Sequence, residues 1–140
     1  KGSKVYDDDE WNAYRYGRLY TWEMAKQACP SGWRVPSKAD WEQLERTMGM
    51  TDAEIRKIDG IRTQTQVVQL LAQQNVLYYL QGFYREGLGY DALGNYTIFW
   101  TSSESMSDLV WTWDLYEGAW FFLPSYKSPK TDYYSLKCVK

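Results

Sequence analysis

The chain has 140 residues, the size of one domain, and can bury a core without a metal or a dense set of disulfides. Its 16 basic and 18 acidic residues nearly balance, which excludes a strongly basic nucleic-acid-binding protein as the default interpretation. It has no histidine, the commonest general base, and no apolar run that could span a membrane. Because 18% of its residues are aromatic, we expect a loop-rich domain held together by large rings.

The N-terminal stretch is polar and acidic. We expect residues 1–14 to form a linker or extension, followed by a single domain at 15–140. Aromatic and apolar residues between Tyr14 and Tyr20 then predict a first strand.

Hydroxyl side chains precede four predicted helical segments and would cap them: Thr21, Ser37, Thr51 and Thr65. Pro30 and Gly32 end the first of these helices. Asp40 and Glu54 each stand three residues after a cap, which is the spacing of a capping box. The first half of the chain is therefore predicted to be helical.

The second half is dominated by β-favouring and aromatic residues, interrupted by turn residues at short intervals. We expect strands near 77–84, 97–102, 109–116, 119–123 and 134–139. Glu117-Gly118 predicts a tight turn between two of them. Helices followed by a small antiparallel sheet indicate an α+β fold.

The chain contains two cysteines, Cys29 and Cys138, so only one intramolecular disulfide is possible. The alternative is two separate buried thiols in a cytosolic protein. Neither cysteine belongs to a C-x-x-C pair, which gives little support to metal binding or redox cycling. We favour the disulfide, and with it an oxidising, exported location.

Three segments, in this order, resemble one known family: YGRLYTWEMAKQACPSGWRVPSKADWEQL, LQGFYREGLGYDALGNYTIFWTSSES and the terminal YSLKCVK. The first has an aromatic-containing helix, a Cys, a Gly-aromatic turn and a Pro-Ser start of a second helix. This order is similar to the core of the C-type lectin-like fold. Together the segments resemble the Fibrobacter succinogenes major paralogous domain, a module of exported bacterial proteins.

The resemblance implies a C-type lectin-like domain with N-terminal helices, a small antiparallel sheet and long loops. It implies a disulfide that joins Cys29, after the first helix, to Cys138 on the last strand. It also implies a secreted, periplasmic or cell-surface location in a bacterium, and a lipid anchor through a removed N-terminus is compatible with it. The family has no established catalytic residues, so the resemblance predicts fold and location better than function.

Calcium-dependent sugar binding is an idea that the fold suggests and the motifs do not support. Lectins of this fold hold calcium with Glu-Pro-Asn or Gln-Pro-Asp and with Trp-Asn-Asp, whereas Trp113-Asp114 is followed here by Leu115. The oxygen ligands that could lie near one another are Asp91, Asn95, Glu104, Asp108 and Asp114. We expect these to be scattered carboxylates and amides, with no metal and no cofactor.

Rings lie on both faces of the predicted hairpin, so they cannot all belong to a core. Exposed rings beside polar groups can stack on sugars or anchor a protein partner. The candidate ligand-binding residues are Trp111, Trp113, Asp114, Tyr116, Trp120, Phe122 and Tyr126. The remaining tryptophans of the helices, turn and strand are assigned to the framework: Trp22, Trp33, Trp41 and Trp100.

We therefore expect a non-enzymatic, extracytoplasmic binding module that recognises a glycan or a cell-surface protein through residues 82–130. The first alternative is a structural or assembly domain of an adhesin, pilus tip or surface component without a small ligand. The second is a hydrolase with an unrecognised pair of carboxylates, which no motif singles out.

Overall fold

The computed structural model describes residues 2–57, 80–116 and 121–140, with side chains omitted for 121–123. A 3₁₀ helix η1 (Tyr6–Asp8) precedes four α-helices: α1 (Glu10–Tyr16), α2 (Trp22–Ala28), α3 (Lys38–Thr47) and α4 (Asp52–Ile55). Among the described helices, none is long and apolar enough to cross a membrane. The predicted helical piece that begins at Thr65 lies outside the described residues.

The predicted caps are confirmed at three helices. The Thr21 hydroxyl accepts a hydrogen bond from the backbone of Met24 at the start of α2. Ser37 and Asp40 form a reciprocal capping box at the start of α3. An equivalent box, formed by a threonine and a glutamate, starts α4. Each box satisfies backbone N–H groups that have no partner inside the helix.

The strand predicted from Tyr14 is wrong in its first half, because α1 extends to Tyr16. Asp9 caps this helix by accepting a hydrogen bond from the backbone of Trp11 (3.0 Å), and Gly17 ends it with a φ of +85°. The segment predicted as a linker or extension also contacts the domain. Lys4 pairs with Leu19, and the neighbouring Val5 is buried.

Five strands form one sheet in the order β2-β1-β3-β4-β5. Their bounds are β1 (Gln81–Arg85), β2 (Gly89–Leu93), β3 (Tyr96–Met106), β4 (Leu109–Tyr116) and β5 (Phe121–Pro129). The sheet is mixed, not antiparallel throughout, because β1 and β3 pair in parallel at Gly82 and Thr97. The α+β class is confirmed. The predicted turn at 117–118 lies outside the described residues.

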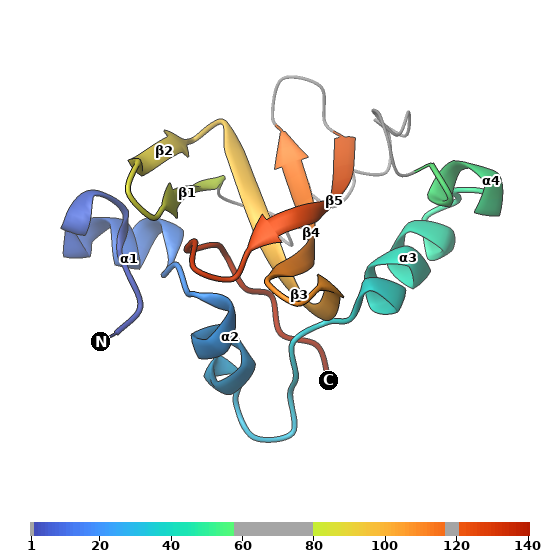
Figure 1. Ribbon diagram of the computed structural model, residues 1–140, viewed down its shortest axis with the longest axis horizontal. Helices are drawn as coiled ribbons and strands as arrows, with labels where there is room; N and C mark the ends of the chain where they lie inside the picture. The colour runs from blue at the N-terminus through green and yellow to red at the C-terminus, as the bar shows by residue number, and fades with distance from the viewer. Residues whose placement is uncertain (1, 58–79, 117–120) are drawn as a thin grey trace.

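Two differences from the predicted strands have local causes. Strand β2 was not expected, because glycines at 87, 89 and 94 resemble a loop, yet they shape the tight turns on either side of β2. The last predicted strand, 134–139, is a chain segment held by isolated bridges: Tyr133 to Tyr84, Tyr134 to Tyr20, Ser135 to Phe99 and Val139 to Arg34. This segment connects the sheet to the helical half (Figure 1).

The sheet carries a core on each face, because neighbouring residues of a strand point to opposite sides. The cluster beside α3 contains Trp41, Leu80, Phe99, Trp113 and Leu115. The cluster beside α2 and the C-terminal segment contains Trp22, Ala25, Phe83, Ile98, Trp100, Val110 and Tyr134. In Figure 1, α2 lies below the sheet, whereas α3 and α4 lie at its right.

Indole hydrogen bonds fix α2 to the central strand. The Trp22 indole donates to the carbonyl of Thr101 (2.9 Å), and the Trp100 indole donates to the carbonyl of Tyr20 (2.6 Å). Trp22, Trp41 and Trp100 are buried, as predicted for framework residues. Trp33 differs, because 46% of it is exposed.

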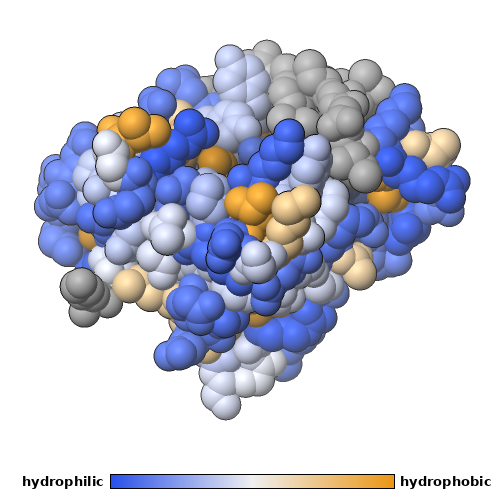
Figure 2. All heavy atoms as spheres, in the orientation of Figure 1, coloured by the Kyte–Doolittle hydropathy of each residue, from blue (hydrophilic) through white to orange (hydrophobic). Residues whose placement is uncertain are grey.

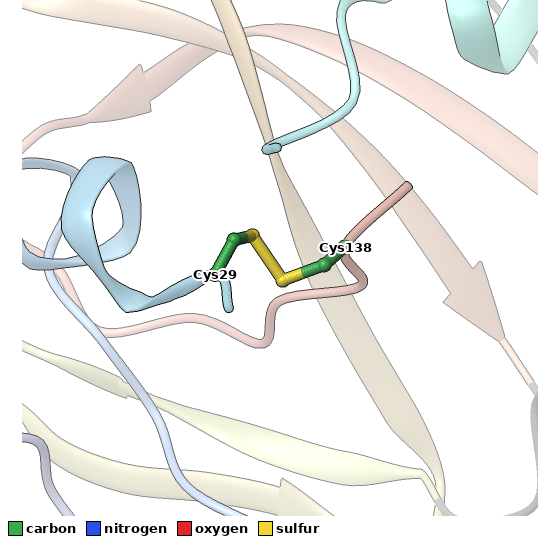
Figure 3. The surroundings of a disulfide bond; sticks show 2 residues. All are labelled: Cys29 and Cys138. Carbon is green, nitrogen blue, oxygen red and sulfur yellow. A yellow bond between two sulfur atoms is a disulfide. The ribbon is translucent and has the colours of Figure 1, made fainter. Parts of the chain in front are cut away.

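The predicted disulfide is present between Cys29 and Cys138, whose Cα atoms are 5.8 Å apart (Figure 3). Cys29 follows α2, and Cys138 lies on the C-terminal segment, so the bridge joins the helical half to the end of the chain. It closes a loop with a sequence separation of 109.

Replacing both cysteines by serine should lower the free energy of unfolding by about 4–5 kcal/mol, because closure of so long a loop restricts the unfolded chain. Urea denaturation of the two proteins, each with and without reductant, measures this difference. Reductant should destabilise the native protein alone. Equal stability of both proteins without reductant would contradict the structural role of the bridge.

Candidate functional site

Two adjoining pockets lie on the face of the sheet that α2 and the C-terminal segment cover in part. Their volumes are about 420 Å³ and 380 Å³, and both are lined by Arg85, Ile98 and Asp114. We call the two pockets together the Asp114 site. The first pocket adds Lys127, Ser128, Asp132 and Tyr134, and the second adds Phe83, Asp91, Tyr96 and Tyr116.

Asp114 is the buried carboxylate at the junction of the two pockets, with 7% of the residue exposed. The Tyr96 hydroxyl donates to its Oδ2 (2.7 Å), and the Thr112 hydroxyl donates to its Oδ1 (3.0 Å). The Ser128 hydroxyl lies 2.8 Å from that of Thr112. Because Thr112 gives its proton to Asp114, Ser128 must donate to Thr112. A chain of oriented hydroxyls therefore holds the carboxylate in one position.

Burial raises the pKa of Asp114 to about 6, although the hydrogen bonds from Tyr96 and Thr112 and the positive charge of Arg85 oppose the shift. Burial also raises the pKa of Tyr96, and the adjacent Asp114 raises it further. The Tyr96 hydroxyl therefore remains protonated and acts as a donor to Asp114 at any ordinary pH.

A second buried carboxylate, Asp132, lines the first pocket. Its Oδ2 accepts a hydrogen bond from the Tyr134 hydroxyl (2.8 Å), and its Oδ1 accepts one from the backbone of Glu86 (3.1 Å). Both oxygens of Asp132 and both of Asp114 thus have donors within the protein. These hydrogen bonds fix both carboxylates in position.

Aromatic rings surround the polar centre of the second pocket. The Tyr96 ring lies 5.9 Å from that of Tyr116 and 6.0 Å from that of Phe83, measured between centroids. Tyr116 is 42% exposed and stands at the pocket rim. The site therefore combines apolar ring surfaces with oriented hydrogen-bonding groups.

Comparison with known families adds one finding. The sequence profile described as Fibrobacter succinogenes major domain matches residues 1–140. The chain belongs to the Fibrobacter succinogenes major domain family. Neither the curated proteins nor the solved structures give a match. The ligand class is therefore inferred from the residues of this chain.

The fold of this chain brings two of the predicted site residues together, Asp114 and Tyr116. Trp113 is placed in the core instead, with none of its surface exposed. Its ring stacks on Trp41 at 6.1 Å, and its indole donates to the buried carboxylate of Glu45. A ligand at the surface cannot reach Trp113, so we assign this residue to packing.

The other predicted rings do not join the Asp114 site. Trp111 and Tyr126 form a separate half-buried pair, 5.7 Å between centroids, with the ammonium of Lys38 5.0 Å from the Trp111 ring. Trp111 alternates with Thr112, which places it on the opposite face of β4 from Asp114. Trp120 and the side chain of Phe122 lie outside the described residues.

Several residues of the site were not predicted from the sequence: Arg85, Tyr96, Thr112, Ser128, Asp132 and Tyr134. One sequence signal pointed to part of this set. Thr112 and Asp114 alternate with Trp111 and Trp113, and this alternation places the two pairs on opposite faces of β4. The partners of the polar pair come from distant segments, and their proximity is created by the fold.

The oxygen ligands considered for calcium are divided between different places. Asp91, Asn95 and Asp114 line the second pocket, whereas Glu104 forms an ion pair with Lys130 at 2.7 Å. In the part of the chain that the structure describes, no group of three Cys, Asp or Glu side chains could hold a metal ion.

The placement of Trp113 predicts that Trp113→Ala lowers the free energy of unfolding by about 3–5 kcal/mol, the usual loss for a buried tryptophan. Trp111→Ala, a matched change on the same strand, should lower it much less because that ring is half-buried. Urea denaturation of both variants measures the difference. Equal losses would contradict the assignment of Trp113 to the core.

The raised pKa of Asp114 predicts a pH dependence of stability. Between its ordinary pKa of 3.8 and about 6, the folded protein holds a proton that the unfolded chain releases. Stability relative to Asp114→Asn should therefore fall by about 2–3 kcal/mol from pH 4 to pH 7.5. Denaturation of both proteins across this pH range tests the sign of this change in stability. A difference that stays constant or grows with pH would contradict the burial of Asp114.

Asp40 provides a control of opposite sign. Its hydrogen bond with Arg34 lowers the pKa of Asp40, so the stability that it contributes is lost as the pH falls below 3.8. The difference in unfolding free energy between Asp40→Asn and the native protein should therefore shrink as the pH falls. The corresponding difference for Asp114→Asn should grow as the pH rises.

Proposed function

We propose that this domain is a non-enzymatic, extracytoplasmic binding module with a C-type lectin-like fold, and that it binds a glycan at the Asp114 site. One observation carries the proposal. A buried carboxylate, fixed by two hydroxyl donors, lies in an open pocket beside tyrosine rings, one of which is 42% exposed.

A glycan fits this combination because a sugar ring has an apolar face and a rim of hydroxyl groups. Tyr116 and Tyr96 offer ring surfaces to the apolar face. Asp114, Arg85 and Asn95 offer acceptors and donors to the hydroxyl groups from the same pocket. A few oriented polar groups in a ring-lined pocket are typical of small-ligand sites.

Binding is favoured over hydrolysis by the state of the two carboxylates. A glycosidase needs one carboxyl that gives a proton to the leaving group and a second that attacks or activates water. Both oxygens of Asp114 and both of Asp132 already accept hydrogen bonds from the protein. These donors fix both carboxylates, and the remaining lone pair on an oxygen can accept a hydrogen bond from a ligand hydroxyl.

The proposed fold and location follow from the same features. The order of helices before a sheet, with a disulfide from α2 to the C-terminal segment, is compatible with the C-type lectin-like fold. A disulfide persists best in an oxidising compartment, which supports a periplasmic, secreted or cell-surface location.

An assembly domain is the second candidate, and one observation favours it. Trp11 and Tyr14 on α1 are 66% and 87% exposed, and their rings lie 5.9 Å apart. The face shown in Figure 2 is mostly hydrophilic, and its apolar residues form small separate patches.

A glycan array, read with calcium and with chelator, tests the proposal. The native protein should bind a defined set of glycans in both conditions. Tyr116→Ala should weaken this binding roughly five- to tenfold, because one ring contact is worth about 1 kcal/mol. The double variant Trp11→Ala, Tyr14→Ala removes exposed rings outside the site and should bind as the native protein does.

Two results would contradict the proposal. An empty array for the native protein would favour protein recognition or assembly. Binding that survives Tyr116→Ala but disappears in the double variant would move the site from the Asp114 pockets to α1.

A further inference from the structure

We propose that the glycan bound at the Asp114 site carries an anionic group, a carboxylate or a sulfate, which pairs with Arg85. This inference rests on the proposed function and specifies its ligand class. The observation behind it is the position of one guanidinium group, which lies at the junction of both pockets and forms no ion pair with any residue that the structure describes.

Arg85 is the last residue of β1 and lines both pockets. Among the described residues, only Ile98 and Asp114 also line both. Ile98 is apolar and Asp114 is held by Tyr96 and Thr112. Among the residues that the structure describes, Arg85 is therefore the cation that lines both pockets, whereas Lys127 lines the first pocket alone.

The guanidinium group has a defined position. Its central carbon lies over the Phe83 ring, 4.8 Å from the centroid. An aromatic ring accepts no conventional hydrogen bond from the guanidinium group in such a contact, so its N–H donors can still bind oxygen acceptors. Within residues 2–57, 80–116 and 121–140, no ion pair or side-chain hydrogen bond engages these N–H groups.

The acids of the same pockets do not neutralise this group by direct contact. Asp114 and Asp132 use both carboxylate oxygens to accept hydrogen bonds from protein donors. Glu86 and Asp91 line the pockets as well, but neither forms an ion pair with Arg85 in the described structure. Lys127 adds a second positive charge to the first pocket.

A guanidinium group binds a planar carboxylate through two parallel hydrogen bonds, and it binds the oxygens of a sulfate in a similar manner. A neutral sugar would leave most of its donors to water. The remaining groups of the site, Asp114 and the tyrosine rings, suit the neutral hydroxyls and the apolar face of the same sugar. An acidic sugar therefore uses more of the site than its neutral parent does.

The test uses oligosaccharides in matched pairs, each uronic-acid or sulfated member beside its neutral parent, at one fixed ionic strength. We expect the native protein to bind the acidic member roughly tenfold more tightly, because a charge-assisted pair is stronger than a neutral hydrogen bond. Arg85→Gln should remove this preference, because the acidic member then loses far more affinity than the neutral parent does. Isothermal titration calorimetry gives both affinities.

Arg15→Gln is the matched control, because it removes the same charge from α1, outside both pockets. It should keep the preference for acidic sugars. Separate carboxylate and sulfate pairs show which anion Arg85 selects.

The outcomes separate this inference from the proposed function. Equal binding of acidic and neutral members by the native protein, or a preference that survives Arg85→Gln, would overturn the role of Arg85 and leave glycan binding intact. Binding to no member of any pair would overturn the proposed function as well.

Discussion

Burial of β4 on both faces is the constraint on which the fold and the candidate site depend. The strand lies between β3 and β5, and its side chains from Thr112 to Leu115 are all buried. Trp113 and Leu115 join the core beside α3. Thr112 and Asp114 point to the other face, where an ionisable group must be compensated by partners. The same strand therefore supplies a tryptophan core and a polar site.

The compensation of Asp114 explains why the site is rigid. Its carboxylate accepts hydrogen bonds from Tyr96 on β3 and from Thr112 on its own strand, and Ser128 on β5 orients Thr112. Three neighbouring strands thus position one acid, and burial raises its pKa to about 6. A fixed carboxylate needs little reorganisation when a ligand hydroxyl approaches, which favours binding.

The sequence predicted local features better than contacts between distant segments. Capping at Ser37 and Asp40 depends on residues three apart, and the disulfide of Cys29 was implied by the family resemblance; both are confirmed. Strand β2 was missed because its glycines favour a loop until β1 lies beside it. The alternation of side chains along a strand predicts that Trp113 and Asp114 lie on opposite faces of β4. It does not predict which face packs into the core, because both faces are buried.

The central claim is that a glycan occupies the Asp114 site. The most direct measurement is an NMR titration that follows the methyl signal of Ile98, which lines both pockets, together with the ring signals of Tyr96 and Tyr116. With a glycan that the protein binds, these signals should shift together with one dissociation constant. Shifts confined to Trp11 and Tyr14, with Ile98 unchanged, would contradict the account.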